Sequence, residues 1–267
     1  MLKLMLVTDN IDEIIEAQDA GVDRIFFDLE YINKSERQKG RNTFISKYNI
    51  NDISKIKSKM KTSELLVRIN PINPNSNYEI NKVVNDGADI VMLPMIIDVQ
   101  DVIDFTDYVK NRSKTCLLLE TAQSLVRIDD IISITGINEV FIGLNDLHIS
   151  LNLSFMFELL SGGIIEYMSK KILNKNLPFG FGGIAKIGEG IFPAETILAE
   201  HYRLGSTSVI LSRTFRNEVN NNCKINIHKE ISKIRKMENE ILKWSENDFL
   251  ENILLIKTYI ANIVKNI

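Results

Sequence analysis

Short apolar runs recur along the chain at fairly regular intervals, and most of them are continuous rather than alternating with polar residues. A continuous apolar run of this length is typical of a parallel strand that is covered on both faces. Such runs lie at residues 2–7, 24–30, 64–70, 89–95, 115–121, 139–146, 177–183 and 208–213.

The segments between these runs have the apolar spacing of amphipathic helices, for example at 11–21, 77–88, 99–111 and 124–136. Three of these segments reach a glycine, Gly21, Gly87 or Gly136, which is a common residue at a helix end. Eight strands that alternate with helices predict an α/β fold, a (β/α)8 TIM barrel. A doubly wound open sheet is the alternative, but the first turn, VTDNID, lacks the glycines of its phosphate-binding fingerprint.

The pattern changes after the last apolar run. A polar segment is followed by two amphipathic helices that divide near Ser245–Asp248. We expect residues 1–216 to form the barrel core and residues 217–267 to form a C-terminal helical extension that completes or caps it. One of these helices is a candidate for the eighth helix of the barrel. The other is surplus, and we expect it to pack on its own barrel rather than on a neighbouring subunit.

Composition narrows the class of protein. The 267 residues are 45% hydrophobic and carry a formal net charge of −3, without a long basic run, which argues against a nucleic-acid partner. Cys116 and Cys223 lie far apart and are expected to be reduced thiols. No stretch approaches the roughly 18 apolar residues of a membrane span, and the N-terminus reads as a strand rather than a signal peptide. A cytoplasmic location is therefore expected.

In a barrel of this kind the chemistry lies at the C-terminal ends of the strands. Several charged residues fall there: Asp28, Glu30, Arg68, Glu120, Asp146 and Arg213. Glu120 ends the apolar run CLLL, and a buried carboxylate there needs a cation, a proton or a water-filled mouth. Carboxylates from different strands, without His or Cys nearby, suit Mg²⁺ or Mn²⁺. The alternative is that they cap helices or pair with Arg68 and Arg213.

A cluster of glycines follows the seventh apolar run, in FGFGGIAKIGEGIFPAE. The loops after strands seven and eight of such barrels often bind phosphate through backbone N–H groups. Gly182, Gly183, Ser212 and Arg213 are therefore candidates for binding a phosphorylated ligand, either a sugar phosphate or the diphosphate arm of CoA. The alternative is a tight mobile lid that binds no anion.

Several motifs together resemble the HpcH/HpaI aldolase and citrate lyase β-subunit family. They are FDLEYINKSERQKGR (27–41), LVRIN (66–70), DIVMLPM (89–95), LLLET (117–121) and VFIGLNDLHISL (140–151), of which the last two together are the most specific. The resemblance covers residues 1–216. It implies a pyruvate- or phosphoenolpyruvate-type TIM barrel in which Glu120 and Asp146 bind the divalent metal. It also implies that Arg68, with Asn70 beside it, binds the substrate carboxylate or enolate oxygen.

The resemblance implies reversible retro-aldol or retro-Claisen cleavage through an enolate of a 2-oxo acid or an acyl-CoA thioester. It also implies a homo-oligomer, trimer or hexamer. The chain departs from the family at Tyr31, where the relatives have an acidic residue or a histidine. The general base is therefore open among Tyr31, Asp28, Glu30 and a metal-held water, and Lys39 and Arg41 match a basic pair only approximately. A non-catalytic barrel that binds a metabolite or partner and has lost its base is the alternative function.

Overall fold

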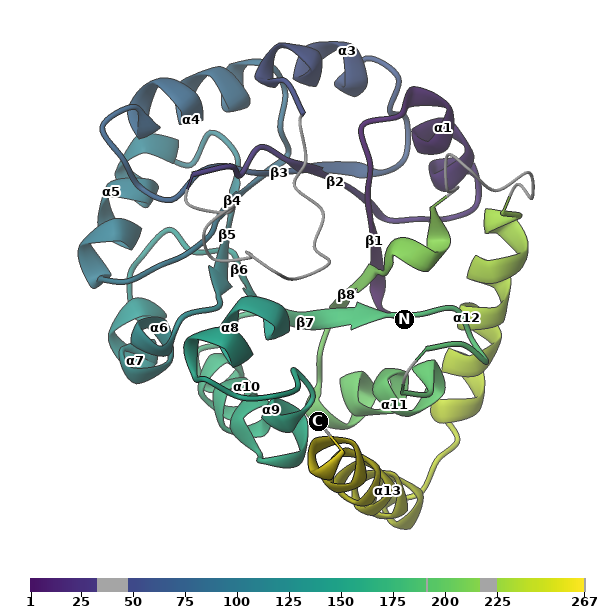
Figure 1. Ribbon diagram of the computed structural model, residues 1–267. Coiled ribbons are helices and arrows are strands. Elements are labelled where there is room, and N and C mark those ends of the chain that lie inside the picture. The colour runs from purple at the N-terminus through teal and green to yellow at the C-terminus, as the bar shows by residue number, and fades with distance from the viewer. Residues whose placement is uncertain (33–47, 191, 217–224, 267) are drawn as a thin grey trace.

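The protein is a closed barrel of eight parallel strands, as the computed structural model of residues 1–32, 48–190, 192–216 and 225–266 shows (Figure 1). The predicted TIM barrel is confirmed. Each strand pairs with the next along the chain, and β1 pairs with β8 to close the ring. The strands are β1 (Lys3–Val7), β2 (Arg24–Asp28), β3 (Glu64–Arg68), β4 (Ile90–Leu93), β5 (Lys114–Leu119), β6 (Glu139–Ile142), β7 (Phe179–Ile184) and β8 (Ser208–Leu211).

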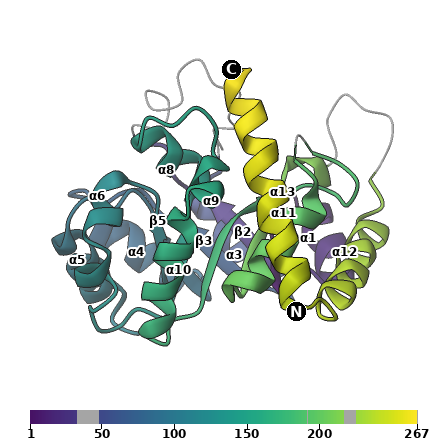
Figure 2. The same cartoon turned by 90° about the horizontal axis from the view of Figure 1, so that it is seen from below.

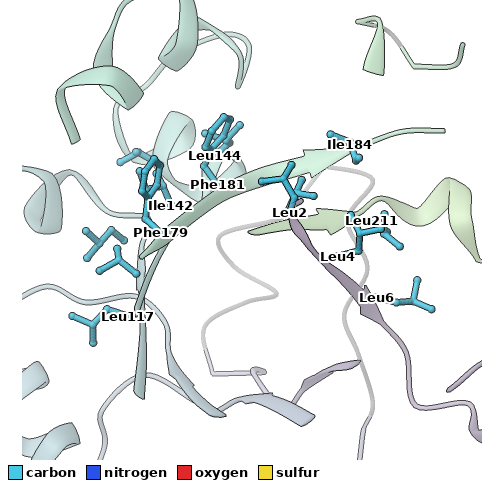
Figure 3. Packing of buried hydrophobic residues seen from close by; sticks show 14 of the residues in the cluster. Leu2, Leu4, Leu6, Leu117, Ile142, Leu144, Phe179, Phe181, Ile184 and Leu211 are labelled. Carbon is cyan, nitrogen blue, oxygen red and sulfur yellow. The ribbon is translucent and has the colours of Figure 1, made fainter. Parts of the chain in front are cut away.

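The continuous apolar runs arise because successive strand residues face two different buried layers. One set faces the barrel interior and forms a small cluster of Met5, Phe26, Leu66, Ile90, Met92, Cys116, Leu118 and Phe141. The alternate set, which includes Leu4, Leu6, Leu117 and Ile142, belongs to a larger cluster with the surrounding helices (Figure 3). Because the period is two, Asp28 follows Phe26, Arg68 follows Leu66 and Glu120 follows Leu118 on the inward side.

The N-terminal end of the barrel interior contains a buried ion-pair network centred on Arg24. Arg24 is 2% exposed, and its Nε lies 2.9 Å from Glu64 while its Nη1 lies 2.7 Å from Glu139. Burial alone would lower the pKa of Arg24, but the carboxylates of Glu139 and Glu64 outweigh it and raise the pKa. Glu64 is also paired with Lys114 at the exposed side of the network, at 2.6 Å. Arg24 therefore ties β2 to its neighbour β3 and to β6, whose pairing partners are β5 and β7.

Helices surround the barrel. The longer ones that follow the strands are α1 (Ile11–Asp19), α4 (Ser76–Asn85), α5 (Val99–Val109), α10 (Ile164–Asn174) and α11 (Ala194–Leu204). Gly21 and Gly87 have φ of 87° and 103° just after α1 and α4, which supports their prediction as helix ends. Shorter elements are η1 (Ile50–Asp52), α3 (Ile53–Lys57), α8 (Leu144–Ser150), α9 (Glu158–Ser161) and η2 (Arg213–Phe215).

Two predicted elements were wrong in detail. The helix predicted at 124–136 is divided into α6 (Ala122–Val126) and α7 (Ile128–Ile131), because Arg127 leaves the helical conformation between them. The strand predicted at 139–146 ends at Ile142, and α8 begins two residues later. Asp146 consequently lies in the first turn of α8 rather than at a strand end.

The C-terminal segment forms α12 (Ile227–Ile241) and α13 (Glu246–Lys265). In Figure 2, α12 lies near α1 and α11, which it contacts, and α13 runs along α11 and contacts α9. Glu238 of α12 is completely buried and accepts hydrogen bonds from the Leu2 backbone at 2.7 Å and the Tyr202 hydroxyl at 2.8 Å. The extension is thus bonded to the N-terminal strand of the barrel. In the described part of the chain, no helix is long and apolar enough to cross a membrane.

Candidate active site

A cavity of about 390 Å³ lies at the C-terminal ends of the strands. Its floor is apolar and consists of inward-facing residues of the barrel, Val7, Phe26, Leu118, Phe141 and Ile210. The structure brings most of the predicted site residues together around this floor, namely Asp28, Arg68, Glu120, Asp146, Gly182, Gly183, Ser212 and Arg213. A ligand here would meet an apolar base and a charged wall.

Arg68 is held in a fixed orientation by two acidic residues of β2 and the turn after it. Its Nε donates to Asp28 Oδ1 at 2.9 Å and its Nη2 donates to Asp28 Oδ2 at 2.8 Å, while Glu30 Oε2 lies 3.3 Å from Nη2. Burial would lower the pKa of Arg68, but Asp28 and Glu30 outweigh it and raise that pKa well above its usual value. The remaining nitrogen, Nη1, has no partner among the described residues and is left for a ligand in the cavity.

Glu120 is 2% exposed, and its carboxylate lies near Met95, which follows β4, and Gly143, which follows β6. Oε1 accepts a hydrogen bond of 3.1 Å from the Met95 backbone, which adopts a left-handed conformation with φ of 52°. Burial raises the pKa of Glu120 well above its usual value, the negative charges of Glu30 and Asp146 raise it further, and Arg68 only partly opposes them. The ionised carboxylate is therefore unfavourable here unless a positive charge shares it.

The donor atoms of this wall fit a hard divalent cation. Glu120 and Asp146 supply carboxylate oxygens, which Mg²⁺ and Mn²⁺ prefer. Asp28 and Glu30 contact Arg68, and the negative charges of Glu30 and Asp146 act against ionisation of Glu120. No group of three or more His, Cys, Asp or Glu side chains arranged for a metal occurs among the described residues. Two protein carboxylates are nevertheless sufficient for an ion that keeps several water ligands.

The β7–β8 side of the cavity carries glycines and basic residues. Gly182 has φ of 51°, and a Cβ there would lie 2.6 Å from Leu144 Cδ1, so a larger residue would collide with the start of α8. Ser212 caps η2, and Arg213 lies beside it at the cavity. Arg216, which the sequence analysis missed, also lines the cavity. Its spacing of three residues from Arg213 was the available signal in the sequence.

Tyr31 and Asn70 do not line this cavity. Both line a second cavity of about 470 Å³ together with Tyr78 and Glu79, and the Tyr31 side chain is 66% exposed. Glu30 is buried behind Arg68, so Asp28 is the one side chain among the candidate bases that lines the main cavity.

Lys39 and Arg41 lie outside the described residues. Tyr48, which the sequence analysis did not consider, packs its ring 4.9 Å from Phe27, and burial raises the pKa of its phenol to about 12.

Gly143→Ala is predicted to displace the carboxylate of Glu120. A Cβ at Gly143 would lie 2.7 Å from Glu120 Oε2 and 2.8 Å from Glu120 Cβ, so the carboxylate would have to move. We expect Mn²⁺ affinity, measured by titration, to fall about tenfold because a metal site tolerates little displacement of a ligand. Gly21→Ala is the control, since a Cβ there meets no atom within 4 Å and affects only the backbone of a remote turn. Equal Mn²⁺ affinity in both variants would contradict the assigned position of Glu120.

Comparison with known proteins supports the same reading of the chain. Its structure is similar to the crystal structure of an HpcH/HpaI aldolase from Desulfitobacterium hafniense DCB-2, with a TM-score of 0.59 and 14% sequence identity over 92% of this chain and 94% of that chain. At this identity the likeness shows the fold alone. No curated protein matches the chain. The family model "HpcH/HpaI aldolase/citrate lyase" matches residues 4–158, a range that includes Asp28, Arg68, Glu120 and Asp146. Because this match covers more than half of the sequence, the chain belongs to the HpcH/HpaI aldolase/citrate lyase family, as its motifs predicted.

Proposed function

We propose that this member of an aldolase and lyase family is a Mg²⁺- or Mn²⁺-dependent carbon–carbon lyase. It would stabilise the enolate of a 2-oxo acid or an acyl-CoA thioester during reversible retro-aldol or retro-Claisen cleavage. The observation that carries the proposal is the buried carboxylate of Glu120 at the cavity, beside Asp146 and Glu30, whose negative charges act against its ionisation. Such a wall is best explained by a cation that binds there together with the substrate.

The charged side chains at the β2, β3, β5 and α8 side of the cavity have separate roles in this proposal. Glu120 and Asp146 would hold the divalent ion, which supplies Lewis-acid stabilisation of the negative charge that develops on the substrate oxygen. Arg68 would donate from Nη1 to the substrate carboxylate or carbonyl oxygen. Asp28 and Glu30 keep the guanidinium in that orientation through their contacts at 2.8–3.3 Å. The apolar floor would exclude water and so strengthen these interactions.

The β7–β8 side suits a second anionic group on the substrate. Arg213 and Arg216 line the cavity with Ser212, and Gly182 and Gly183 bring the β7 backbone to its surface. A phosphorylated substrate or the phosphates of CoA would both be attracted to this side. We place this second group at the β8 end because the acidic wall lies at β2, β5 and α8.

Deuterium uptake at C3 of pyruvate in D₂O, followed by proton NMR, tests the proposed function. The account predicts uptake that requires Mg²⁺ or Mn²⁺ and stops on addition of EDTA, because the enolate forms only when its oxygen is stabilised. Acetyl-CoA is the second substrate to be tested under the same conditions. Absence of metal-dependent uptake from both compounds would contradict enolate chemistry and favour a non-catalytic, ligand-binding barrel.

A further inference from the structure

The side-chain amide of Asn70 is hydrogen-bonded to the backbone of the turn after β2 and to Glu79. Its side chain is 3% exposed, and its Oδ1 accepts hydrogen bonds from the backbone N–H groups of Tyr31 at 3.0 Å and Ile32 at 3.1 Å. These two residues directly follow Glu30, whose carboxylate lies against Arg68. The amide of Asn70 therefore secures the turn that presents Glu30 to the arginine.

Glu79 of α4 determines which way that amide points. It is 8% exposed, and its Oε1 accepts from Asn70 Nδ2 at 2.8 Å and from the Asn70 backbone N–H at 3.3 Å. Because Oε1 receives the backbone N–H, it must act as an acceptor, and Asn70 must turn its NH₂ group toward it. The Oδ1 atom then faces the backbone N–H groups of Tyr31 and Ile32. In the opposite orientation the NH₂ group of Asn70 would face these two N–H donors, and no hydrogen bond could form.

We propose that Glu79 is a positioning residue for the site, acting through Asn70 and the backbone of Tyr31 and Ile32 to hold Glu30 against Arg68. The inference rests on the proposed function, because Arg68 is there assigned to the substrate. The chain of contacts touches neither Glu120 nor Asp146, which come from β5 and α8. Glu30 and Arg68 act on Glu120 only through their charges, so we expect a larger effect on how Arg68 binds substrate than on metal binding.

Glu79→Leu removes the acceptor, whereas Glu79→Gln retains an acceptor oxygen at the same position. Asn81→Ala is the matched control on α4, because its amide bonds only to Asn77 on the exposed side and to Arg112. NMR hydrogen exchange would be measured at the Tyr31 and Ile32 amides and at Arg68 Nε–H. We expect exchange about tenfold faster in Glu79→Leu, as for the loss of one hydrogen bond, and wild-type rates in the other two variants.

The second readout is the kinetics of C3 exchange on pyruvate. We expect Glu79→Leu to raise KM about tenfold, with smaller changes in kcat and in Mn²⁺ affinity, and Glu79→Gln to keep the wild-type KM. Unchanged amide exchange in Glu79→Leu, or faster exchange with wild-type KM, would overturn the inference. If the wild-type protein has no activity, the proposed function fails separately. In that case the hydrogen-exchange rate of Arg68 Nε–H tests the positioning role of Glu79. A wild-type exchange rate in Glu79→Leu would overturn that role.

Discussion

Glu120→Gln is expected to lower the rate of metal-dependent C3 exchange by roughly a hundredfold to a thousandfold, the usual effect of removing a main stabiliser of transition-state charge. Glutamine has the same shape and can still accept the Met95 N–H, so the loss would reflect the missing charge. The same variant should raise the free energy of unfolding of the metal-free protein at pH 7. This follows because the raised pKa of Glu120 means that the folded state disfavours the ionised carboxylate, a cost that a neutral amide removes.

The combination of higher stability and lower activity separates this account from simple misfolding. Activity would be followed by proton NMR, and stability by urea denaturation in EDTA. Glu200→Gln is the control, because Glu200 is 2% exposed on α11 and pairs with Arg203 away from the cavity. The Glu200→Gln protein should have a lower free energy of unfolding than wild type and the wild-type rate of C3 exchange. A Glu120→Gln protein that is less stable than wild type without metal, or equally active with metal, would contradict the assigned role.

Arg24→Met is predicted to lower the free energy of unfolding by about 3–5 kcal/mol, the typical cost of removing one partner from a buried ion pair. Methionine fills similar space but leaves Glu139 and part of Glu64 without their cation inside the barrel. Urea denaturation monitored by circular dichroism would measure the change.

Lys114→Met removes the cation at the exposed side of the same network. It should lower the free energy of unfolding by no more than about 1 kcal/mol. The double variant Arg24→Met/Glu139→Gln should be more stable to unfolding than Arg24→Met alone, because Glu139→Gln removes one uncompensated negative charge. A cost below 1 kcal/mol for Arg24→Met alone would show that the network does not hold this end of the barrel together. Mn²⁺ affinity should stay unchanged below the melting temperature, since the network lies at the N-terminal ends of the strands.

The barrel was predictable because both faces of each strand are buried, which produces apolar runs that a single chain displays directly. Asp28, Arg68 and Glu120 were predictable as cavity residues because side chains alternate along a strand. This alternation of side chains predicts directions only within a strand and not in the turn that follows it. Tyr31 and Asn70 lie beyond β2 and β3, and local turns direct them to a different cavity.

Other parts of the site depend on contacts that sequence spacing does not encode. Asp146 reaches the wall from the first turn of α8, after the chain has already left β6. Glu79 approaches Asn70 from α4, where its position in the sequence resembles any polar residue of an amphipathic helix. The division at Arg127 also depends on local backbone geometry rather than on the apolar spacing, which continues across it.

The central claim is that Glu120 and Asp146 together hold a divalent cation at the mouth of the barrel. Titration with Mn²⁺, followed by the loss of the free-ion signal in electron paramagnetic resonance, tests this most directly. The account predicts a single site in the wild-type protein that is lost in Glu120→Gln, strongly weakened in Asp146→Asn and unchanged in Glu200→Gln. Mn²⁺ bound with wild-type affinity by a protein carrying both site substitutions would contradict it.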